Sequence, residues 1–371
     1  MASPYTVAYM FPDAKSVGSV SAFRTKPMAK TDVDLIVTYC GVCHTDVHFI
    51  DNDWGMSRYP LVPGHEIVGH VTRVGTEVKE LKVGDQVAMG CVAQSCYKCE
   101  CCQKGRDNLC ADRRFTYFHD TTDETGTHRH MGGFSSFMRT DYRKLYKVPR
   151  GLEQNHVGPL MCAGVTVFEP IRNLLGDSLD GKGKTIGVLG IGGLGHLALQ
   201  FVSKTGATAV AFSRGKKKEE FTKFLGASYL VDTTNADAMQ AAYGTLDQLI
   251  VCTSGGTFEC DKFLPLVKPF GNMHLCGIPD APITFTAQLL VFSRISISGN
   301  PTGGSTDTKL MLEFAAKHGI EPIIEEFPHS KAHEAIQKIR DGTIRFRAVL
   351  KNDLVDVEET LTALNNGYVK L

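Results

Sequence analysis

Two patterns of hydrophobic and polar residues divide the chain. From Thr31 to about Pro149, short apolar runs such as LIVTYCGVC and EIVGHVTRVG are separated by glycines and other turn residues. Short strands with this punctuation predict an irregular, β-rich domain. From about Gly158, strand-like runs such as TIGVLG and TAVAFS alternate with helix-like stretches such as GLGHLALQFVSKTG. This alternation predicts βαβ units around a parallel sheet, so the expected fold class is α/β with a doubly wound sheet.

Length and charge narrow the class of function. The chain has 371 residues, which favours two domains because one core usually stops growing at roughly 250–300 residues. Forty basic residues balance forty acidic ones, so we expect a small-molecule substrate and neither nucleic acid nor membrane as partner. The N-terminal stretch lacks the pattern of a secretory signal, which favours the cytoplasm. In that reducing compartment, clustered members of the twelve cysteines are better interpreted as metal ligands than as disulfides.

A glycine motif indicates a dinucleotide site. Gly190, Gly192 and Gly195 form a G-x-G-x-x-G motif directly after a predicted strand and at the start of a predicted helix. In this context, glycines allow the backbone to approach a pyrophosphate, whose charge then lies at the helix N-terminus. The alternative is a purely structural glycine turn in an α/β domain.

The next predicted strand suggests which dinucleotide binds. An acidic residue about 20 positions on would bind the ribose of NAD, but the chain instead has Ser213, Arg214 and the lysines 216–218. A hydroxyl, a guanidinium and several ammonium groups suit the 2′-phosphate of NADP(H). The alternative is that the lysines only solvate a helix end, although cations at an N-terminus oppose the helix dipole.

Five cysteines in the stretch CYKCECCQKGRDNLC suggest a structural metal site. The spacing C-x2-C-x2-C-x7-C selects Cys96, Cys99, Cys102 and Cys110 as four thiolate ligands of one zinc ion and leaves Cys101 outside the set. A zinc ion with four cysteine ligands has no open position for a substrate. We therefore expect this zinc to be structural.

A catalytic zinc would need an open position and other ligands. Cys43, His65 and Cys162 would supply two thiolates and one imidazole, which is the ligand set of a zinc alcohol dehydrogenase. Spacing alone does not join these three residues, because a single cysteine or histidine is usually part of the core.

Several motifs together resemble a known family. GVCHTDVH, YPLVPGHEIVG, the four-cysteine segment, LMCAGVTVF and GIGGLGH follow one another as in the zinc-dependent medium-chain dehydrogenases, and the chain is most similar to the NADPH-dependent reductases of the cinnamyl-alcohol-dehydrogenase type. The resemblance implies a GroES-like catalytic domain of residues 1–158 and 300–371, with a zinc lobe at 91–113. A Rossmann domain that binds NADP(H) would span residues 159–299, and two copies would form a homodimer through these sheets.

The resemblance also implies roles for single residues. Cys43, His65 and Cys162 would hold the catalytic zinc, with Glu66 able to take the fourth position. Thr45 would bind the substrate oxygen, and His48 would pass its proton to solvent, while Asp46 would hold the imidazole of the histidine ligand. Contacts with the cofactor are expected at residues in four regions of the chain: Thr166; Gly190, Gly192, Gly193, Leu194 and Gly195; Ser213, Arg214 and Lys218; and Thr253, Gly277, Ile278 and Asn300.

The expected activity is reversible hydride transfer between NADPH and an aromatic or medium aliphatic aldehyde, which gives a primary alcohol. Alternatives are a zinc dehydrogenase of a polyol or secondary alcohol, a zinc-free quinone reductase, and a non-catalytic NADPH-binding redox sensor. Trp54 and the aromatic residues near Phe115 favour an apolar pocket, although Trp54 would equally suit the core. His119, His128 and His130 would form either a further metal site or, as we expect, part of a solvated polar loop.

Overall fold

The computed structural model describes residues 5–117, 119–123 and 126–365 and divides the chain into two compact units. The first unit comprises residues 1–162, 304–316 and 322–371, and the second comprises residues 163–303 and 317–321. The predicted fold class is confirmed, because one unit is β-rich and the other is built on a parallel sheet.

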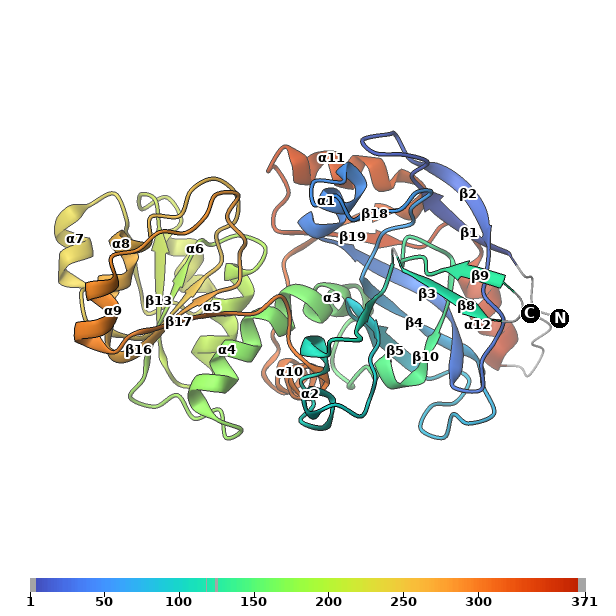
Figure 1. The fold of residues 1–371 in the computed structure, drawn as a ribbon, viewed down its shortest axis with the longest axis horizontal. Coiled ribbons are helices and arrows are strands. Elements are labelled where there is room, and N and C mark those ends of the chain that lie inside the picture. The colour runs from blue at the N-terminus through green and yellow to red at the C-terminus, as the bar shows by residue number, and fades with distance from the viewer. Residues whose placement is uncertain (1–4, 118, 124–125, 366–371) are drawn as a thin grey trace. The chain divides into compact units, whose positions relative to one another are not determined.

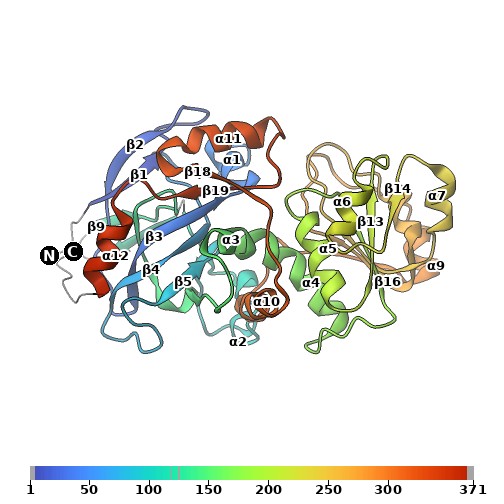
Figure 2. The same ribbon diagram turned by 180° about the vertical axis from the view of Figure 1, so that it is seen from behind.

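The first unit is built around a mostly antiparallel sheet, whose strands β3, β4 and β5 lie side by side in both views (Figures 1 and 2). Its seven strands are β3 (Asp32–Val42), β4 (Glu66–Val74), β5 (Gln86–Met89), β10 (Phe137–Asp141), β11 (Tyr146–Lys147), β18 (Ile324–Pro328) and β19 (Arg347–Lys351). Residues from both ends of the chain therefore share one sheet, because β19 pairs with β3.

Short elements complete the first unit. Its paired strands outside the main sheet are β1 (Tyr5–Met10) with β2 (Ser19–Arg24), β6 (Val92–Gln94) with β7 (Arg114–Phe115), and β8 (Asp120–Asp123) with β9 (Gly126–Arg129). Its helices are α1 (His44–Asp51), α2 (Glu100–Gln103), α3 (Gln154–Pro159), α11 (Ala332–Arg340) and α12 (Val357–Asn365), and α10 (Ser305–His318) lies mostly in it. The core packs apolar residues of β3, including Leu35 and Val37, with Ile336 of α11.

The second unit contains a six-stranded, fully parallel sheet. Its strands are β12 (Thr185–Leu189), β13 (Thr208–Ser213), β14 (Tyr229–Asp232), β15 (Leu246–Val251), β16 (Val267–Leu275) and β17 (Ser296–Gly299). The spatial order β14-β13-β12-β15-β16-β17 is the 3-2-1-4-5-6 order of the doubly wound dinucleotide fold. The order in which strands are added to the sheet reverses between β12 and β15. Ligands of such folds bind at this point, beside the carboxyl ends of the strands.

Helices of the second unit precede or connect these strands in the chain. They are α4 (Val165–Leu175), α5 (Gly195–Lys204), α6 (Glu219–Phe224), α7 (Ala236–Ala241), α8 (Cys260–Phe263) and α9 (Ala287–Ser293). Every residue of β15 is buried, as expected for a central strand covered on both faces. Helices α4 and α5 pack together through Phe168 and Phe201, whose ring centroids are 5.4 Å apart.

Candidate active site

Four potential metal ligands from distant parts of the first unit lie together. The ligand atoms of Cys43, His65, Glu66 and Cys162 are all within 4.8 Å of one another, and the sulfurs of Cys43 and Cys162 are 4.0 Å apart. Cys43 follows β3, while His65 directly precedes β4. Because these strands pair antiparallel, with Gly41 opposite Glu66, the ends that carry the two ligands lie side by side.

The donor set suits zinc. Two thiolates, one imidazole and a carboxylate match the ligands of a zinc site that exchanges its fourth position. Hydrogen bonding from Cys162 and His65 outweighs burial and holds the pKa of the Cys43 thiol well below its ordinary value. Oε2 of the buried Glu66 has no hydrogen-bond partner among the described residues. A buried carboxylate oxygen that lacks a partner beside two sulfurs and an imidazole is well placed to bind a cation.

The carboxylate of Asp46 contacts two backbone N–H groups, the Tyr117 hydroxyl and the His65 ring. Its Oδ1 accepts hydrogen bonds from the backbone N–H of Gly64 at 2.9 Å and from the Tyr117 hydroxyl at 2.8 Å, and it lies 3.1 Å from His65 Nδ1. Its Oδ2 accepts from the backbone N–H of Cys43 at 2.9 Å. A carboxylate beside Nδ1 fixes the imidazole orientation and leaves Nε2 for a metal.

The charge of Asp46 also changes the protonation of His65. Burial alone would lower the pKa of His65, but the carboxylate of Asp46 and the Cys43 side chain raise it well above its ordinary value. A metal at this site would displace that proton, so metal affinity should fall as the pH is lowered.

Sequence analysis did not find two residues that belong to this site. Arg347 of β19 is buried and forms an ion pair with Glu66, although the two residues are 281 positions apart. Burial raises the pKa of Glu66 to about 7, and Arg347 opposes that shift. Tyr117 is the other residue, with its hydroxyl 3.2 Å from His65 Nδ1. Neither residue belongs to a motif with metal-ligand spacing, so no local signal identified them.

The expected relay residues lie on helix α1. Thr45 and His48 are half-buried and three positions apart, which places them on one face of the helix. His48 Nδ1 lies 2.7 Å from Asp53 Oδ2, and its ring centroid is 4.8 Å from that of Trp54. Trp54 is 39% exposed, so it is not a core residue.

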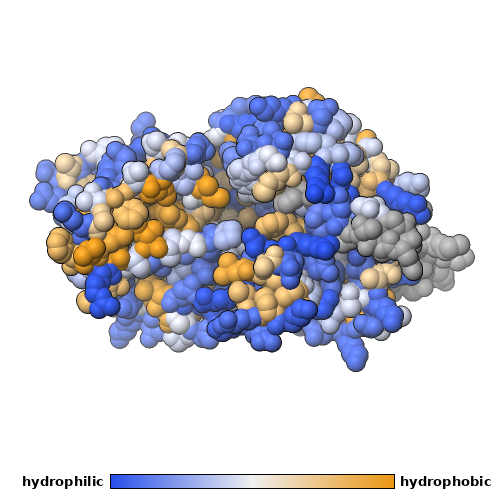
Figure 3. Space-filling model, in the orientation of Figure 1, coloured by the Kyte–Doolittle hydropathy of each residue, from blue (hydrophilic) through white to orange (hydrophobic). Residues whose placement is uncertain are grey.

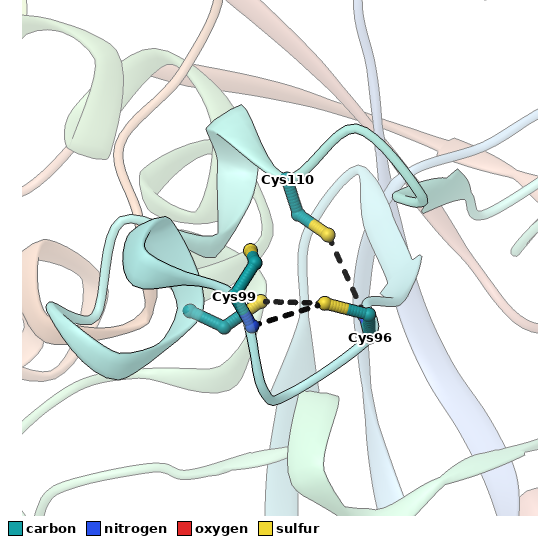
Figure 4. A group of neighbouring side chains, drawn as sticks. Cys96, Cys99 and Cys110 are labelled. Carbon is teal, nitrogen blue, oxygen red and sulfur yellow. Dashed lines mark hydrogen bonds between the residues drawn. The ribbon is translucent and has the colours of Figure 1, made fainter.

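The four cysteines with zinc-ligand spacing also converge, and Figure 4 labels Cys96, Cys99 and Cys110 of this group. The sulfurs of Cys96, Cys99, Cys102 and Cys110 lie within 4.8 Å of one another, and Cys101 does not belong to this group. The backbone N–H of Cys99 donates to Cys96 Sγ at 3.3 Å. Backbone N–H groups lower the pKa of Cys96 to about 6, which favours a thiolate. The described residues form no further group of three or more potential metal ligands.

The expected glycine turn connects β12 with α5 in the second unit. Gly190 has a φ of +90°, which a residue with a side chain rarely adopts. A Cβ atom on Gly195 would overlap the carbonyl oxygen of Gly190, so the helix begins very close to the turn. Around Gly192 there is open space instead, which leaves room for a ligand. Gly193 and Leu194 complete the turn.

The basic residues expected at the 2′-phosphate follow β13. Ser213 is the last residue of this strand, and Arg214 comes directly after it. Lys218 Nζ donates to the carbonyl oxygen of Ile191 in the glycine turn at 2.7 Å. The structure therefore places Lys218 beside the glycine turn, on the same edge of the sheet as Ser213.

The remaining expected cofactor contacts follow the carboxyl ends of β15, β16 and β17, except Thr166, which lies in the first turn of α4. Asn300 Nδ2 donates to the Thr166 carbonyl oxygen at 3.2 Å, and its Oδ1 lies 2.9 Å from His274 Nε2. Added Cβ atoms on Gly190 and on Gly277 would both meet Thr253, which places these three residues together. Ile278 follows them and is 65% exposed.

The expectation of a solvated polar loop near residue 119 was wrong for two of its histidines. His119 and His130 flank the β8–β9 hairpin and stack on each other, with ring centroids 3.9 Å apart. Burial is the main cause that lowers the pKa of His119 to about 4 and that of His130 to about 2. His128 is half-buried on β9. The described residues place no third metal-binding group beside the stacked pair.

Comparison with known proteins agrees with this geometry. The family profile described as "Alcohol dehydrogenase GroES-like domain" matches residues 29–150, and that described as "Zinc-binding dehydrogenase" matches residues 193–340. Vomilenine reductase of Rauvolfia serpentina is 39% identical over 333 residues, covering 88% of this chain and 89% of the relative.

Solved structures show the same fold. A cinnamyl alcohol dehydrogenase from Sorghum bicolor superimposes with a TM-score of 0.85 at 35% identity, covering 94% of this chain and 98% of that one. CAD from Helicobacter pylori, solved in complex with NADP(H), gives a TM-score of 0.83 at 27% identity and covers 94% and 98% of the two chains. Within the described residues, no helix is long and apolar enough to cross a membrane.

Proposed function

Because the chain belongs to the zinc-binding medium-chain alcohol dehydrogenases, we propose that it is an NADP(H)- and zinc-dependent aldehyde reductase. As a member of this family it is an oxidoreductase of the alcohol dehydrogenase class. The proposed reaction interconverts an aromatic or medium aliphatic aldehyde and a primary alcohol. The observation that carries the proposal is the convergence of Cys43, His65, Glu66 and Cys162 next to α1.

The metal and the cofactor supply the reactive chemistry. Zinc, when bound, would polarise the carbonyl oxygen as a Lewis acid, and NADPH would supply the hydride. Cys43, His65 and Cys162 would hold the metal, and Glu66 would occupy or leave the fourth position. Arg347 stabilises the charge of Glu66 when that carboxylate is not a ligand.

Two residues of α1 would donate and transfer the proton that the substrate oxygen receives. The hydroxyl of Thr45 would donate a hydrogen bond to the substrate oxygen as negative charge develops there. His48 would then replace that proton from solvent. Asp53 accepts from His48 Nδ1, which leaves Nε2 of the ring for proton transfer.

Residues after β13 select the cofactor. Arg214 offers a planar set of donors to a phosphate, and the Ser213 hydroxyl and Lys218 add two more donors. The Lys218 ammonium donates to the Ile191 carbonyl oxygen of the glycine turn, which supports a role for Lys218 in binding the phosphates of the cofactor. At the other end of the cofactor, the hydrogen bond from Asn300 to Thr166 would fix two residues against the nicotinamide.

We also propose that two copies of the chain associate through the second unit. Strand β17 is an edge of the parallel sheet, and an unpaired edge readily pairs with another chain. An apolar patch covers the adjoining surface (Figure 3), including Val291, Phe292 and Ile278, which are 71%, 84% and 65% exposed. Exposed patches of this kind mark protein interfaces. Phe292→Asp should shift the mass measured by light scattering from that of a dimer to that of a monomer, whereas the surface variant Phe224→Asp should not.

Initial rates of NADPH oxidation test the proposed function. Cinnamaldehyde, a series of aliphatic aldehydes, a ketone and a polyol oxidised in the reverse direction should be compared on enzyme of known zinc content. The proposal predicts turnover of aldehydes with NADPH and much slower rates with NADH. Faster turnover of the polyol or the ketone would favour the secondary-alcohol alternative, and no turnover by zinc-loaded enzyme would favour a non-catalytic protein.

A further inference from the structure

An open pocket of about 600 Å³ in the first unit is lined mainly by cationic and polar residues. Arg58, Arg113 and Arg114 contribute three guanidinium groups to its wall, and Asp120 contributes a carboxylate. Phe115 and His119 also face the pocket. A wall with three cations and one anion favours a negatively charged group.

The three guanidinium groups are held in place but retain donors. Nη1 of Arg113 donates to the Cys110 carbonyl oxygen at 3.0 Å, and Nη1 of Arg114 donates to the Asp120 carbonyl oxygen at 3.3 Å. Nη1 of Arg58 donates to Asp120 Oδ2 at 2.7 Å. A guanidinium has five N–H donors, so most donors of these groups have no partner in the described part of the chain.

Asp120 does not neutralise this pocket. Its carboxylate is already shared between Arg58 and Arg129, which contacts Oδ1 at 3.1 Å. Although burial opposes the shift, these two arginines hold the pKa of Asp120 below its ordinary value. Arg113 and Arg114 form no ion pair within the residues that the structure describes, so their charges are available to a ligand.

His119 contributes a neutral ring to the wall of the pocket. Its ring nitrogens are buried, and a hydrogen bond with the Phe115 backbone only partly opposes the lowering of its pKa by burial. Burial and the charge of Arg114 keep this imidazole neutral, with a pKa of about 4. The positive charge of the pocket wall therefore comes from its three guanidinium groups.

Chain neighbours of the pocket residues belong to the candidate active site. Phe115 in its wall is two residues from Tyr117, and two residues span at most about 7 Å. The Tyr117 hydroxyl is 3.2 Å from His65 Nδ1. On the other side, Gly55 in the wall directly follows Trp54, whose ring lies tilted against that of His48 with centroids 4.8 Å apart.

We propose that the pocket of Arg113, Arg114, Arg58 and His119 binds an anionic group on the substrate, so that the enzyme favours aldehydes with a carboxylate or phosphate remote from the carbonyl. This inference rests on the proposed aldehyde reductase function and specifies its substrate class. Two oxygens of the anion would accept hydrogen bonds from Arg113 and Arg114, while the formyl end would extend along Phe115 towards the metal ligands.

Matched substrates test the inference. The kcat/KM for 4-formylbenzoate should be compared with that for its neutral methyl ester, and that for 4-formylphenyl phosphate with that for 4-methoxybenzaldehyde. We expect a preference of roughly tenfold for at least one anionic member, because charge-assisted hydrogen bonds in an open pocket are partly screened by solvent. The better anionic substrate identifies carboxylate or phosphate as the preferred group.

Variants separate the pocket from a general charge effect. The double variant Arg113→Gln/Arg114→Gln should lose the preference because its KM for the anionic substrate rises, since these arginines bind substrate and transition state alike. Its kcat for the neutral ester should be unchanged. Arg73→Gln removes an exposed cation elsewhere in the same unit and should keep the preference. Salt at about 0.5 M should weaken the preference in the wild-type protein by screening.

The possible results are distinguishable. Reduction of the neutral ester without any preference for either anion would overturn the inference and leave the proposed function intact. A preference that survives in Arg113→Gln/Arg114→Gln would also overturn it. Failure to reduce every aldehyde would contradict the proposed function, and the inference would fail with it.

Discussion

The hydroxyl of Tyr117 offers a direct test of how the site is organised. Tyr117→Phe removes one oxygen and keeps the ring, which packs edge-on against Phe49 with centroids 5.4 Å apart. The lost hydroxyl donates to Asp46 at 2.8 Å and lies 3.2 Å from His65 Nδ1. The substitution therefore disturbs the support of the His65 imidazole and leaves the ligands themselves in place.

The structure gives the expected magnitude. Asp46 is fully buried and keeps the backbone donors of Gly64 and Cys43 in the variant, so its charge remains partly satisfied. A hydrogen bond to a charged group contributes about 1.5–3 kcal/mol, and we expect the lower half of this range. Loss of a partner that orients a histidine ligand typically lowers metal affinity about 10- to 100-fold, and about tenfold is expected here.

Two measurements check this prediction. Zinc transfer to a competing chelator gives the metal affinity of the site, and urea unfolding of the zinc-loaded protein gives the free energy of unfolding. Tyr9→Phe is the matched control, because the buried Tyr9 hydroxyl contacts only His333 Nδ1 at 3.2 Å among the contacts that the structure gives. This control should lose about 1 kcal/mol of stability and no zinc affinity. Identical zinc retention in Tyr117→Phe and Tyr9→Phe would refute the reasoning.

Three further predictions follow from the same structure. Cys102→Ser should lose one zinc per chain and destabilise the fold by several kcal/mol, because a closed site contributes its binding energy to folding, whereas Cys101→Ser should keep the wild-type zinc content and melting temperature. Arg214→Ala should raise the KM for NADPH about 10- to 100-fold and leave the KM for NADH nearly unchanged in steady-state rates; an equal change for both cofactors would rule out a contact with the 2′-phosphate. Lowering the pH from 7 to 5 should protonate His119 and His130 in the unfolded chain only, because their folded pKa values are about 4 and about 2. The free energy of unfolding should therefore fall as the pH drops below the ordinary histidine pKa. The expected loss is about 1–2 kcal/mol per histidine in urea unfolding, and His130→Leu with an undiminished loss would contradict it.

Local patterns were sufficient for most of the fold. The alternation of apolar and amphipathic segments after Gly158 predicted the βαβ units, because central parallel strands such as β15 must be apolar on both faces. The glycine turn was likewise predictable, since Gly190 adopts a conformation that its position after a strand requires. The four cysteines of the C-x2-C-x2-C-x7-C segment lie within fifteen residues, so their spacing was sufficient to predict that they form one ligand group.

Long-range pairing limited what the sequence could predict. Cys43 and His65 meet only because β3 pairs with β4, and no spacing rule fixes that register. The pairing of Arg347 with Glu66 depends on β19 joining the sheet from the other end of the chain. The stacking of His119 on His130 depends on the β8–β9 hairpin, whose polar residues predicted a solvated loop.

The most direct test of the account is the zinc content and NADPH-dependent aldehyde reduction of Cys43→Ser, measured beside Cys101→Ser. Cys43 belongs to the open ligand group, and Cys101 belongs to neither group of potential ligands. We predict that Cys43→Ser keeps the zinc of the four-cysteine site, loses the other zinc and loses aldehyde reduction, while Cys101→Ser retains both metals and full activity. A Cys43→Ser protein that reduces aldehydes at the wild-type rate would contradict the account.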